Sequence, residues 1–199
     1  MSYDFDHIID RQETSCIKWK LYGQDVLPFW VADMDFPAPE PVQFALRRAV
    51  DHGIFGYEFP TQELRETIAN RMERLYDWQI SPEAIVATPG VIAGFVAAAN
   101  AVCSPGEGIL VQPPVYPPFL TVHEKTGLAR QVAPLKYISH NHIINYEMDF
   151  KAFTGGLNSA GVHTAMFLLC NPHNPTGQVY SRFGLERMGE ICLKNGSVI

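Results

Sequence analysis

The spacing of hydrophobic residues changes near residue 84, and this change separates two kinds of predicted element. Residues 1–38 carry aromatic side chains without a regular period, which predicts an irregular arm. Two amphipathic helices then follow. The first begins among the prolines at 37–41 and runs to about His52, where Gly53 predicts its end, and the second covers Thr61–Trp78.

From residue 84 onward, short apolar runs alternate with stretches of helical spacing. The runs predict strands at 84–88, 108–112, 129–134, 143–148 and 165–170, and the stretches between them predict helices at 91–103, 117–126, 150–157 and 181–195. Ser181 and Gly196 have the residue types expected before and after the last helix, and 197–199 resembles the start of a further strand. Apolar strands alternating with helices predict an α/β fold with a mostly parallel sheet covered on both faces.

Composition and charge exclude several classes of function. The 199 residues are 47% hydrophobic and 18% charged, with a net charge of -6, which is ordinary for a globular domain. No Lys/Arg-rich run is present, so we expect no nucleic-acid partner. No apolar run is long enough for a membrane helix, and Met1–Asp10 is too polar for a secretory signal. Four scattered cysteines then fit a cytoplasmic protein with reduced thiols.

Ligands of parallel α/β sheets bind beyond the carboxyl ends of the strands, which directs attention to 88–92, 113–116 and 170–177. At the first of these, Gly90 lets the backbone approach a ligand as a helix begins. The exposed amides and the helix dipole there favour an anion such as phosphate. A glycine at this junction is equally explained by turn geometry alone.

The other two strand ends offer an aromatic ring and an amide. Tyr116 lies in a proline-rich loop that could hold its ring as a plate, although a packed turn explains the same sequence. The run Asn171–Gly177 (NPHNPTG) contains two Asn-Pro pairs, and Asn174 could bond a ring oxygen. The alternative is a tight loop whose Asn residues cap the backbone. Together the three segments suit a flat, phosphorylated heteroaromatic ring.

Other chemistry-bearing residues predict no second site. The pair His140 and His142 is too small for a metal site and reads as a solvated turn. Nothing in the sequence pairs Cys170 with a base, so it reads as a core residue rather than a nucleophile. Neither a P-loop nor a GxGxxG motif is present, so no motif supports nucleotide binding. We assign no metal ligand.

In the segments Phe5–Arg11, Leu27–Phe36 and Asn171–Gly177, the chain resembles a known family, the fold-type I enzymes that use pyridoxal 5′-phosphate (PLP), in the class I/II aminotransferase superfamily. Within it, the sequence is most similar to the MalY/PatB-type cystathionine β-lyase (C–S lyase) branch. Beside Asn171–Gly177, the motifs that carry the resemblance are Phe5–Arg11, Lys18-Trp19, Leu27–Phe36, Gly53–Tyr57 and Pro113–Phe119. The string from Trp30 to Phe36 discriminates best.

The resemblance implies roles for the residues at the strand ends. The backbone amides of Gly90, Val91 and Ile92 would hold the cofactor phosphate. The ring of Tyr116 would stack on the pyridine ring. Asn174 would bond the phenolic oxygen of the cofactor. The implied fold is the large domain of an aspartate aminotransferase-like PLP-dependent transferase.

The arm and the first loops receive implied roles as well. Tyr57 matches a tyrosine that reaches the phosphate of the neighbouring subunit in a homodimer, and Ala32 and Asp33 would border the substrate carboxylate. The resemblance divides the chain into an arm with a small-domain segment, 1–45, and an incomplete PLP-binding large domain, 46–199.

The resemblance covers only the N-terminal half of a typical family member. The family places an Asp for the pyridinium nitrogen, the Schiff-base lysine and an arginine for the substrate carboxylate further on. No lysine of this chain matches the catalytic one, so we name no catalytic residue and expect the chain alone to be inactive. The resemblance also places the strands that pair with 84–88 beyond residue 199.

The implied activity is β-elimination from a sulfur amino acid, with cystathionine giving homocysteine, pyruvate and ammonia. Three alternatives stay open from the sequence. An aminotransferase would use the same cofactor residues. A non-catalytic truncated protein could be inert or could bind a partner. A split enzyme would receive the remaining residues from a second chain.

Overall fold

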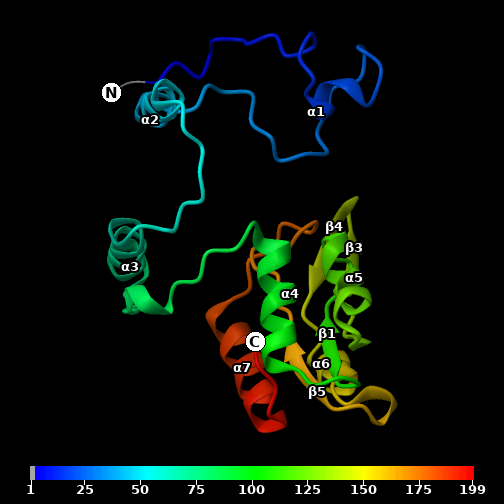
Figure 1. Cartoon of the computed structure of the whole chain (residues 1–199). Coiled ribbons are helices and arrows are strands. Elements are labelled where there is room, and N and C mark those ends of the chain that lie inside the picture. Colours follow the sequence, from blue (N-terminus) through cyan, green and yellow to red (C-terminus); the bar gives the residue numbers. More distant parts are fainter. Residues whose placement is uncertain (1–2) are drawn as a thin grey trace. The chain divides into compact units, whose positions relative to one another are not determined.

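A computed structural model describes residues 3–199 and divides the chain into two compact units, one ending at Thr61 and the other covering Gln62–Ile199 (Figure 1). Each unit is described by itself. The family-based division at 45/46 concerns domains of a longer protein and stays a prediction. No helix among residues 3–199 is both long and apolar enough to cross a membrane.

The first unit consists of irregular chain and two helices, α1 (Ile17–Lys20) and α2 (Glu40–His52). The helix predicted from the prolines at 37–41 to about His52 is α2, and it is confirmed at both ends. Proline occupies its first turn, where a missing N–H costs nothing, and Gly53 closes it in the left-handed conformation at φ 74°. Residues 3–61 contain no strand, so the irregular arm expected from the sequence is also confirmed.

The second unit begins with α3 (Gln62–Tyr76) and the 3₁₀ turn η1 (Pro82–Ala84), where the side chain of Ser81 accepts a hydrogen bond from the amide of Glu83. The strand predicted at 84–88 is not formed. Residues 85–88 belong to no ladder, and Val86 is 80% exposed. An apolar run becomes a strand only when a neighbouring strand pairs with it, and no segment within residues 3–199 does so.

The sheet of the second unit has three parallel strands in the order β2-β1-β5. They are β1 (Gly108–Val111), β2 (Ala129–Val132) and β5 (Thr164–Phe167). Val198 continues the sheet beside β5, because its amide and carbonyl bond Ala165 and Phe167 at 2.8 Å each. The strand start predicted at 197–199 is thereby confirmed.

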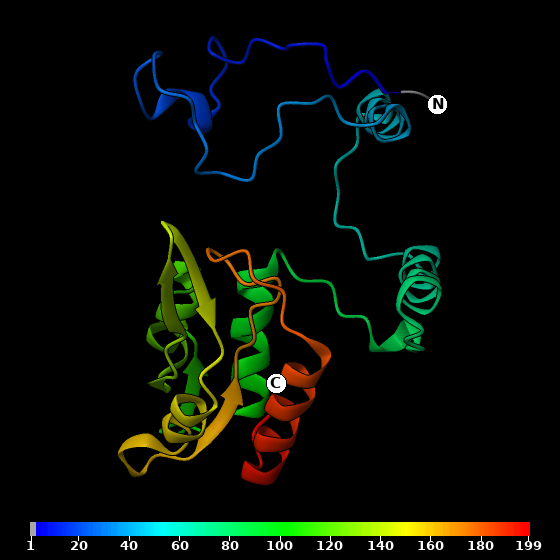
Figure 2. The same cartoon turned by 180° about the vertical axis from the view of Figure 1, so that it is seen from behind.

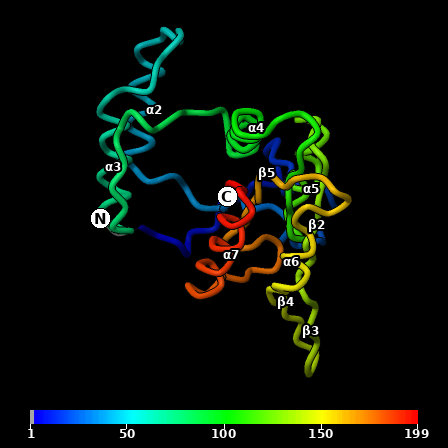
Figure 3. Tube along the Cα trace, turned by 90° about the horizontal axis from the view of Figure 1, so that it is seen from below, coloured from blue at the N-terminus to red at the C-terminus, as the bar shows by residue number. Residues whose placement is uncertain are grey.

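Helices cover both faces of this sheet, as the alternating pattern predicted (Figure 3). On one face, α4 (Val91–Val102) and α5 (Pro117–Thr126) pack against Ile109 and Met166. On the other, α6 (Phe150–Gly156) and α7 (Arg182–Asn195) pack against Leu110 and Phe167. A 3₁₀ turn, η2 (Ser159–Gly161), precedes β5. The hydrophobic core is therefore formed by residues of the second unit.

A hairpin of β3 (Lys136–His140) and β4 (Ile143–Glu147) forms a separate two-stranded antiparallel sheet, drawn as the paired olive arrows in Figure 2. Only its second strand was predicted. The first was missed because its sequence has little hydrophobic periodicity. Asn141 and His142 form the connecting turn with positive φ angles of 50° and 64°, which confirms the solvated turn expected there.

Candidate functional site

Two of the predicted strand-end loops lie directly against each other. They follow β1 and β5, which are neighbours in the sheet, and the amide of Leu168 continues the pairing with a 2.9 Å hydrogen bond to Leu110. Further along, the amide of Tyr116 donates a 2.8 Å hydrogen bond to the carbonyl oxygen of Asn174. The structure thus brings together the aromatic residue and the amide residue that the sequence had placed at separate strand ends.

Tyr116 precedes α5, whose first turn contains Pro117 and Pro118. Its side chain is 39% exposed, and one edge of the ring contacts Phe119 with ring centroids 6.5 Å apart. Phe119 in turn packs against Phe95 of α4, at 5.3 Å. Because the ring is supported on one side and partly open, it can receive a planar ligand.

Gly90 precedes α4 at φ 133° and ψ 164°, a region that is essentially restricted to glycine. Its carbonyl oxygen accepts a 3.1 Å hydrogen bond from the Thr88 hydroxyl. No side chain caps the helix, and no acidic residue lies in its first turn. The amides at the start of α4 therefore have no side-chain acceptor and meet no nearby carboxylate of that turn.

These observations test whether the residues fit a phosphorylated ring. The position where a Cβ of Gly90 would stand has no other atom within 4 Å, and Val91 is 80% exposed. Uncapped amides at a helix start, backed by the dipole, suit a phosphate group. Phe95, which contacts the ring of Phe119 that supports Tyr116, lies in the second turn of the same helix. The residues present therefore fit a phosphate at α4 and a ring beside Tyr116.

His173 is the residue of this site that the sequence reasoning missed. Its side chain is only 1% exposed, although it lies in a loop. Nε2 is 2.9 Å from the carbonyl oxygen of Pro114, and Nδ1 is 3.1 Å from both the carbonyl oxygen of Cys170 and the hydroxyl of Tyr180. Its position between the two Asn-Pro pairs was the available signal.

Tyr180 and Asn171 complete the polar interior of the loop. The amide of Tyr180 donates to Asn171 Oδ1 at 3.2 Å, and the Tyr180 hydroxyl lies 3.4 Å from Gln112 Oε1. Burial, with a smaller contribution from Cys170, raises the pKa of Tyr180 to about 12. The hydroxyl therefore stays protonated at neutral pH and can donate within this cluster.

The cysteines of the second unit differ in environment. Cys192 packs in the core, and burial raises the pKa of its thiol to about 11. Cys170 is half-buried, packs against the apolar cluster of α4 and α5, and accepts a 3.4 Å hydrogen bond from the Asn174 amide. It supports the loop, consistent with the packing role expected from the sequence.

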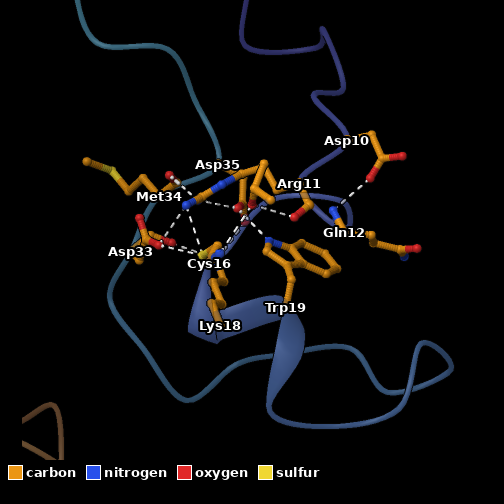
Figure 4. A network of polar contacts seen from close by, with 10 residues as sticks. Asp10, Arg11, Gln12, Cys16, Lys18, Trp19, Asp33, Met34 and Asp35 are labelled. Atoms are coloured by element: carbon orange, nitrogen blue, oxygen red, sulfur yellow. Dashed lines mark hydrogen bonds and ion pairs between the residues drawn. The ribbon is translucent and has the colours of Figure 1, made fainter.

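The predicted residues of the first unit lie elsewhere in the chain and are described within that unit alone. Tyr57 is fully exposed, and Ala32 is exposed as well. Asp33 is partly buried, and its Oδ2 accepts a 2.9 Å hydrogen bond from Arg11 and a 3.2 Å hydrogen bond from the Cys16 thiol (Figure 4). Both interactions lower the pKa of Asp33, that of Arg11 more strongly.

In the same network, the carboxylate of Asp35 accepts hydrogen bonds from three side-chain donors. Lys18 Nζ lies 2.6 Å from Oδ2, while Trp19 Nε1 and Arg11 Nη1 lie 2.9 Å and 2.8 Å from Oδ1 (Figure 4). The bonds from Lys18, Trp19 and Arg11 lower the pKa of Asp35 to about 2. The network ties three separate sequence motifs together, which no periodicity could have indicated.

The part of the chain that the structure describes contains no group of three or more His, Cys, Asp or Glu side chains arranged to hold a metal ion. His140 is the last residue of β3, and His142 lies in the hairpin turn that follows it. Of the buried polar side chains of the second unit, Gln112 and His173 follow β1 and β5, whereas Gln131, Thr164 and Ser197 lie within or beside β2 and β5.

Comparisons with known proteins place these features in context. A family model described as aminotransferase class I and II matches residues 25–199. Cystathionine β-lyase PatB of Bacillus subtilis is 38% identical over 205 residues, and the match covers 98% of this chain and 50% of that protein. Cystathionine β-lyase of Corynebacterium glutamicum is 33% identical, with 96% and 48% covered.

Solved structures give the same result. A PLP-bound C–S lyase from Staphylococcus hominis superposes with a TM-score of 0.84 at 30% sequence identity, covering 100% of this chain and 50% of that one. The likeness confirms the α/β fold type expected from the sequence. The chain spans about half the length of the relatives it matches.

Proposed function

The chain belongs to the aminotransferase class I and II family, and from that premise we propose that it is the N-terminal part of a PLP-dependent carbon–sulfur β-lyase. The observation that carries the proposal is the hydrogen-bonded pair of Tyr116 and Asn174 in a domain that also presents the uncapped start of α4. The similarity to cystathionine β-lyases favours C–S bond cleavage over other reactions of the family.

The residues of the second unit would hold the cofactor. The amides of Gly90, Val91 and Ile92 would bind the phosphate at the α4 start, where the helix dipole favours an anion. The ring of Tyr116, supported by Phe119, would pack against the pyridine ring. Asn174 would donate its side-chain amide to the phenolic oxygen. When bound, PLP supplies an electron sink for the substrate α-carbon.

The first unit would contribute to the substrate side of the intact protein. Ala32 and Asp33 would border the substrate carboxylate. Because Arg11 and the Cys16 thiol already occupy Asp33 Oδ2, the charge of Asp33 is partly compensated and opposes an anionic substrate less. Tyr57, fully exposed in this chain, would reach the phosphate of a neighbouring subunit in a homodimer.

The proposed substrate is a sulfur amino acid such as cystathionine, with homocysteine, pyruvate and ammonia as products. None of the lysines in this chain lies in a context that matches the lysine bonded to the cofactor. We therefore propose that the 199-residue chain binds the cofactor without turning over substrate.

A second function, amino-group transfer, is favoured by the description of the matching family model itself. An aminotransferase would hold the cofactor with the same Gly90, Tyr116 and Asn174. The two activities differ in their requirement for a keto acid, which transamination needs and β-elimination does not. The intact protein, assayed with cystathionine in the presence and absence of a keto acid, separates them.

The first test is binding of pyridoxine 5′-phosphate to the 199-residue chain by equilibrium dialysis. This probe has the ring and phosphate of the cofactor but no aldehyde, so it cannot attach covalently to surface lysines. We expect saturable binding that inorganic phosphate displaces, and no pyruvate from cystathionine with PLP added. Absence of saturable binding contradicts the cofactor site, and formation of pyruvate contradicts the proposed inactivity.

A further inference from the structure

His173 connects the two loops that carry the proposed ring-binding residues. Its side chain is buried between them, and Nε2 lies 2.9 Å from the carbonyl oxygen of Pro114, a residue 59 positions earlier in the sequence. Pro114 lies two residues before Tyr116, and His173 immediately precedes Asn174. The bond therefore joins the loops close to both residues.

The groups around the His173 imidazole indicate which of its two nitrogens carries a hydrogen. Both ring nitrogens face carbonyl oxygens, which only accept: Nε2 lies 2.9 Å from that of Pro114 and Nδ1 lies 3.1 Å from that of Cys170. The Pro114 contact is the shorter, so we place the hydrogen of the neutral ring on Nε2. In the neutral tautomer, Nδ1 then accepts from the Tyr180 hydroxyl, which lies 3.1 Å away and stays protonated at neutral pH. Tyr180 therefore orients the ring so that its donor points at the other loop.

The backbone of His173 is held independently of its side chain. Its amide donates to the Gln178 carbonyl and its carbonyl accepts from the Gly177 amide, both at 2.7 Å. A side-chain substitution therefore leaves the loop itself closed. Between the loops, the 2.8 Å bond from the Tyr116 amide to Asn174 and the packing of Cys170 would then remain, and the loops would be less constrained than with the His173 bond in place.

We propose that His173 is a positioning residue that sets the spacing between Tyr116 and Asn174 for the cofactor ring. The inference rests on the proposed function, because it assigns those two residues to the ring. It concerns the ring and not the phosphate, since the phosphate amides at Gly90 begin a different helix, α4. His173 itself would contact neither the ring nor the phosphate of the cofactor, and it would act through the two loops.

A matched pair of variants tests the proposal. His173→Gln can place an N–H at about the reach of Nε2, whereas His173→Asn ends near the position of Nδ1 and cannot reach Pro114. We expect His173→Asn to weaken pyridoxine 5′-phosphate binding about tenfold, as for loss of one buried hydrogen bond, with inorganic phosphate binding unchanged. His173→Gln should recover most of the affinity, which a purely steric role would not predict.

Amide hydrogen exchange of the full chain, followed by NMR, gives a readout independent of the ligand. In His173→Asn the Tyr116 amide should exchange about tenfold faster, while amides paired between β1 and β2 keep their protection. Equal ring affinity and unchanged Tyr116 exchange in His173→Asn overturn the proposal. So does parallel loss of ring and phosphate binding, which indicates general damage.

The experiment also separates this inference from the proposed function. If the wild-type chain binds no pyridoxine 5′-phosphate, the cofactor assignment fails and the ring-spacing role fails with it, whatever the exchange data show. If the wild type binds and His173→Asn is unaffected, only the His173 role fails. Should His173→Asn not fold, Tyr180→Phe replaces it, with a smaller loss of ring affinity expected and an unchanged affinity overturning the proposal.

Discussion

The backbone amide of Tyr116 lies 2.8 Å from the carbonyl oxygen of Asn174 and donates a hydrogen bond to it. This bond joins the loop after β1 to the loop after β5, 58 residues further along the chain. Because it uses main-chain atoms, the ring of Tyr116 and the side-chain amide of Asn174 are both left available for a ligand. The two strand ends therefore form one continuous surface.

Gly90 offers a direct test of the phosphate position. At φ 133° and ψ 164° a side chain is strained by about 1–3 kcal/mol, so Gly90→Ala should shift the backbone at the α4 start. We expect inorganic phosphate and pyridoxine 5′-phosphate both to bind at least about tenfold more weakly, measured by equilibrium dialysis. The control is Gly189→Ala within α7, where a Cβ meets no atom within 4 Å. Unchanged phosphate binding in Gly90→Ala would place the anion elsewhere.

Two neighbouring glycines of α6 should respond oppositely to the same substitution. A Cβ on Gly156 would lie 2.7 Å from the Val132 carbonyl oxygen and 3.0 Å from Leu110, whereas Gly155 has nothing within 4 Å. Gly156→Ala should lower the free energy of unfolding by about 1–3 kcal/mol through overpacking. Gly155→Ala should be neutral or stabilising by up to about 1 kcal/mol. Urea denaturation measures both, and equal effects would contradict the close packing of α6 on β2.

Acid should disrupt the hydrogen-bond network of the first unit by protonating the carboxylate of Asp35. Its pKa in the folded chain is about 2, below the ordinary 3.8, so the stabilisation is present above about pH 4 and is lost as pH falls through 2. The Trp19 indole N–H donates to this carboxylate, so its NMR signal reports the protonation. Of the three tryptophan indole signals, we expect that of Trp19 to move with a midpoint near pH 2.

The control for that titration is Asp35→Asn, which removes the titrating group while keeping an acceptor oxygen. The Trp19 signal should then lose its low-pH transition, and the signals of Trp30 and Trp78 should be unchanged by the substitution. A Trp19 midpoint at the ordinary aspartate value would show that Lys18 and Arg11 do not hold the carboxylate.

Alkaline titration should show the ionisation of Tyr180 as a step near pH 12. Burial holds its pKa at about 12 against the ordinary 10, so the stabilisation that it contributes is complete below pH 10 and is lost as pH rises through 12. Absorbance near 295 nm follows the eight tyrosines. Tyr180→Phe should remove the step near pH 12, and persistence of that step would assign it to another tyrosine.

Thiol labelling should distinguish the cysteines by depth. Cys192 lies on the buried face of α7 with its pKa raised to about 11, so both access and thiolate content are low at pH 8. Mass spectrometry after brief alkylation should show Cys192 unmodified while the half-buried Cys16 and Cys170 react. Brief urea exposure should make all of them reactive. Early labelling of Cys192 would contradict the packing of α7 on the sheet.

Much of the fold followed from local signals in the sequence. The prolines at 117 and 118 and Gly127 bounded α5 at the predicted residues, and Ser181 and Gly196 bounded α7 in the same way. These ends are predictable because caps satisfy amides and carbonyls within a few residues of themselves. The ends of β1 and β5, and with them Tyr116 and Asn174, could therefore be located from the sequence, and Gly90 could be located from the start of α4.

What only the tertiary structure decided depends on partners that are distant in the sequence. The apolar run at 84–88 is not a strand, because a ladder needs a second strand that local residues cannot supply. The role of His173 rests on a carbonyl 59 residues away, and that of Arg11 on Asp33 and Asp35, 22 and 24 residues away. Periodicity determines which face of an element is buried, whereas the folded chain alone determines which donor meets which acceptor.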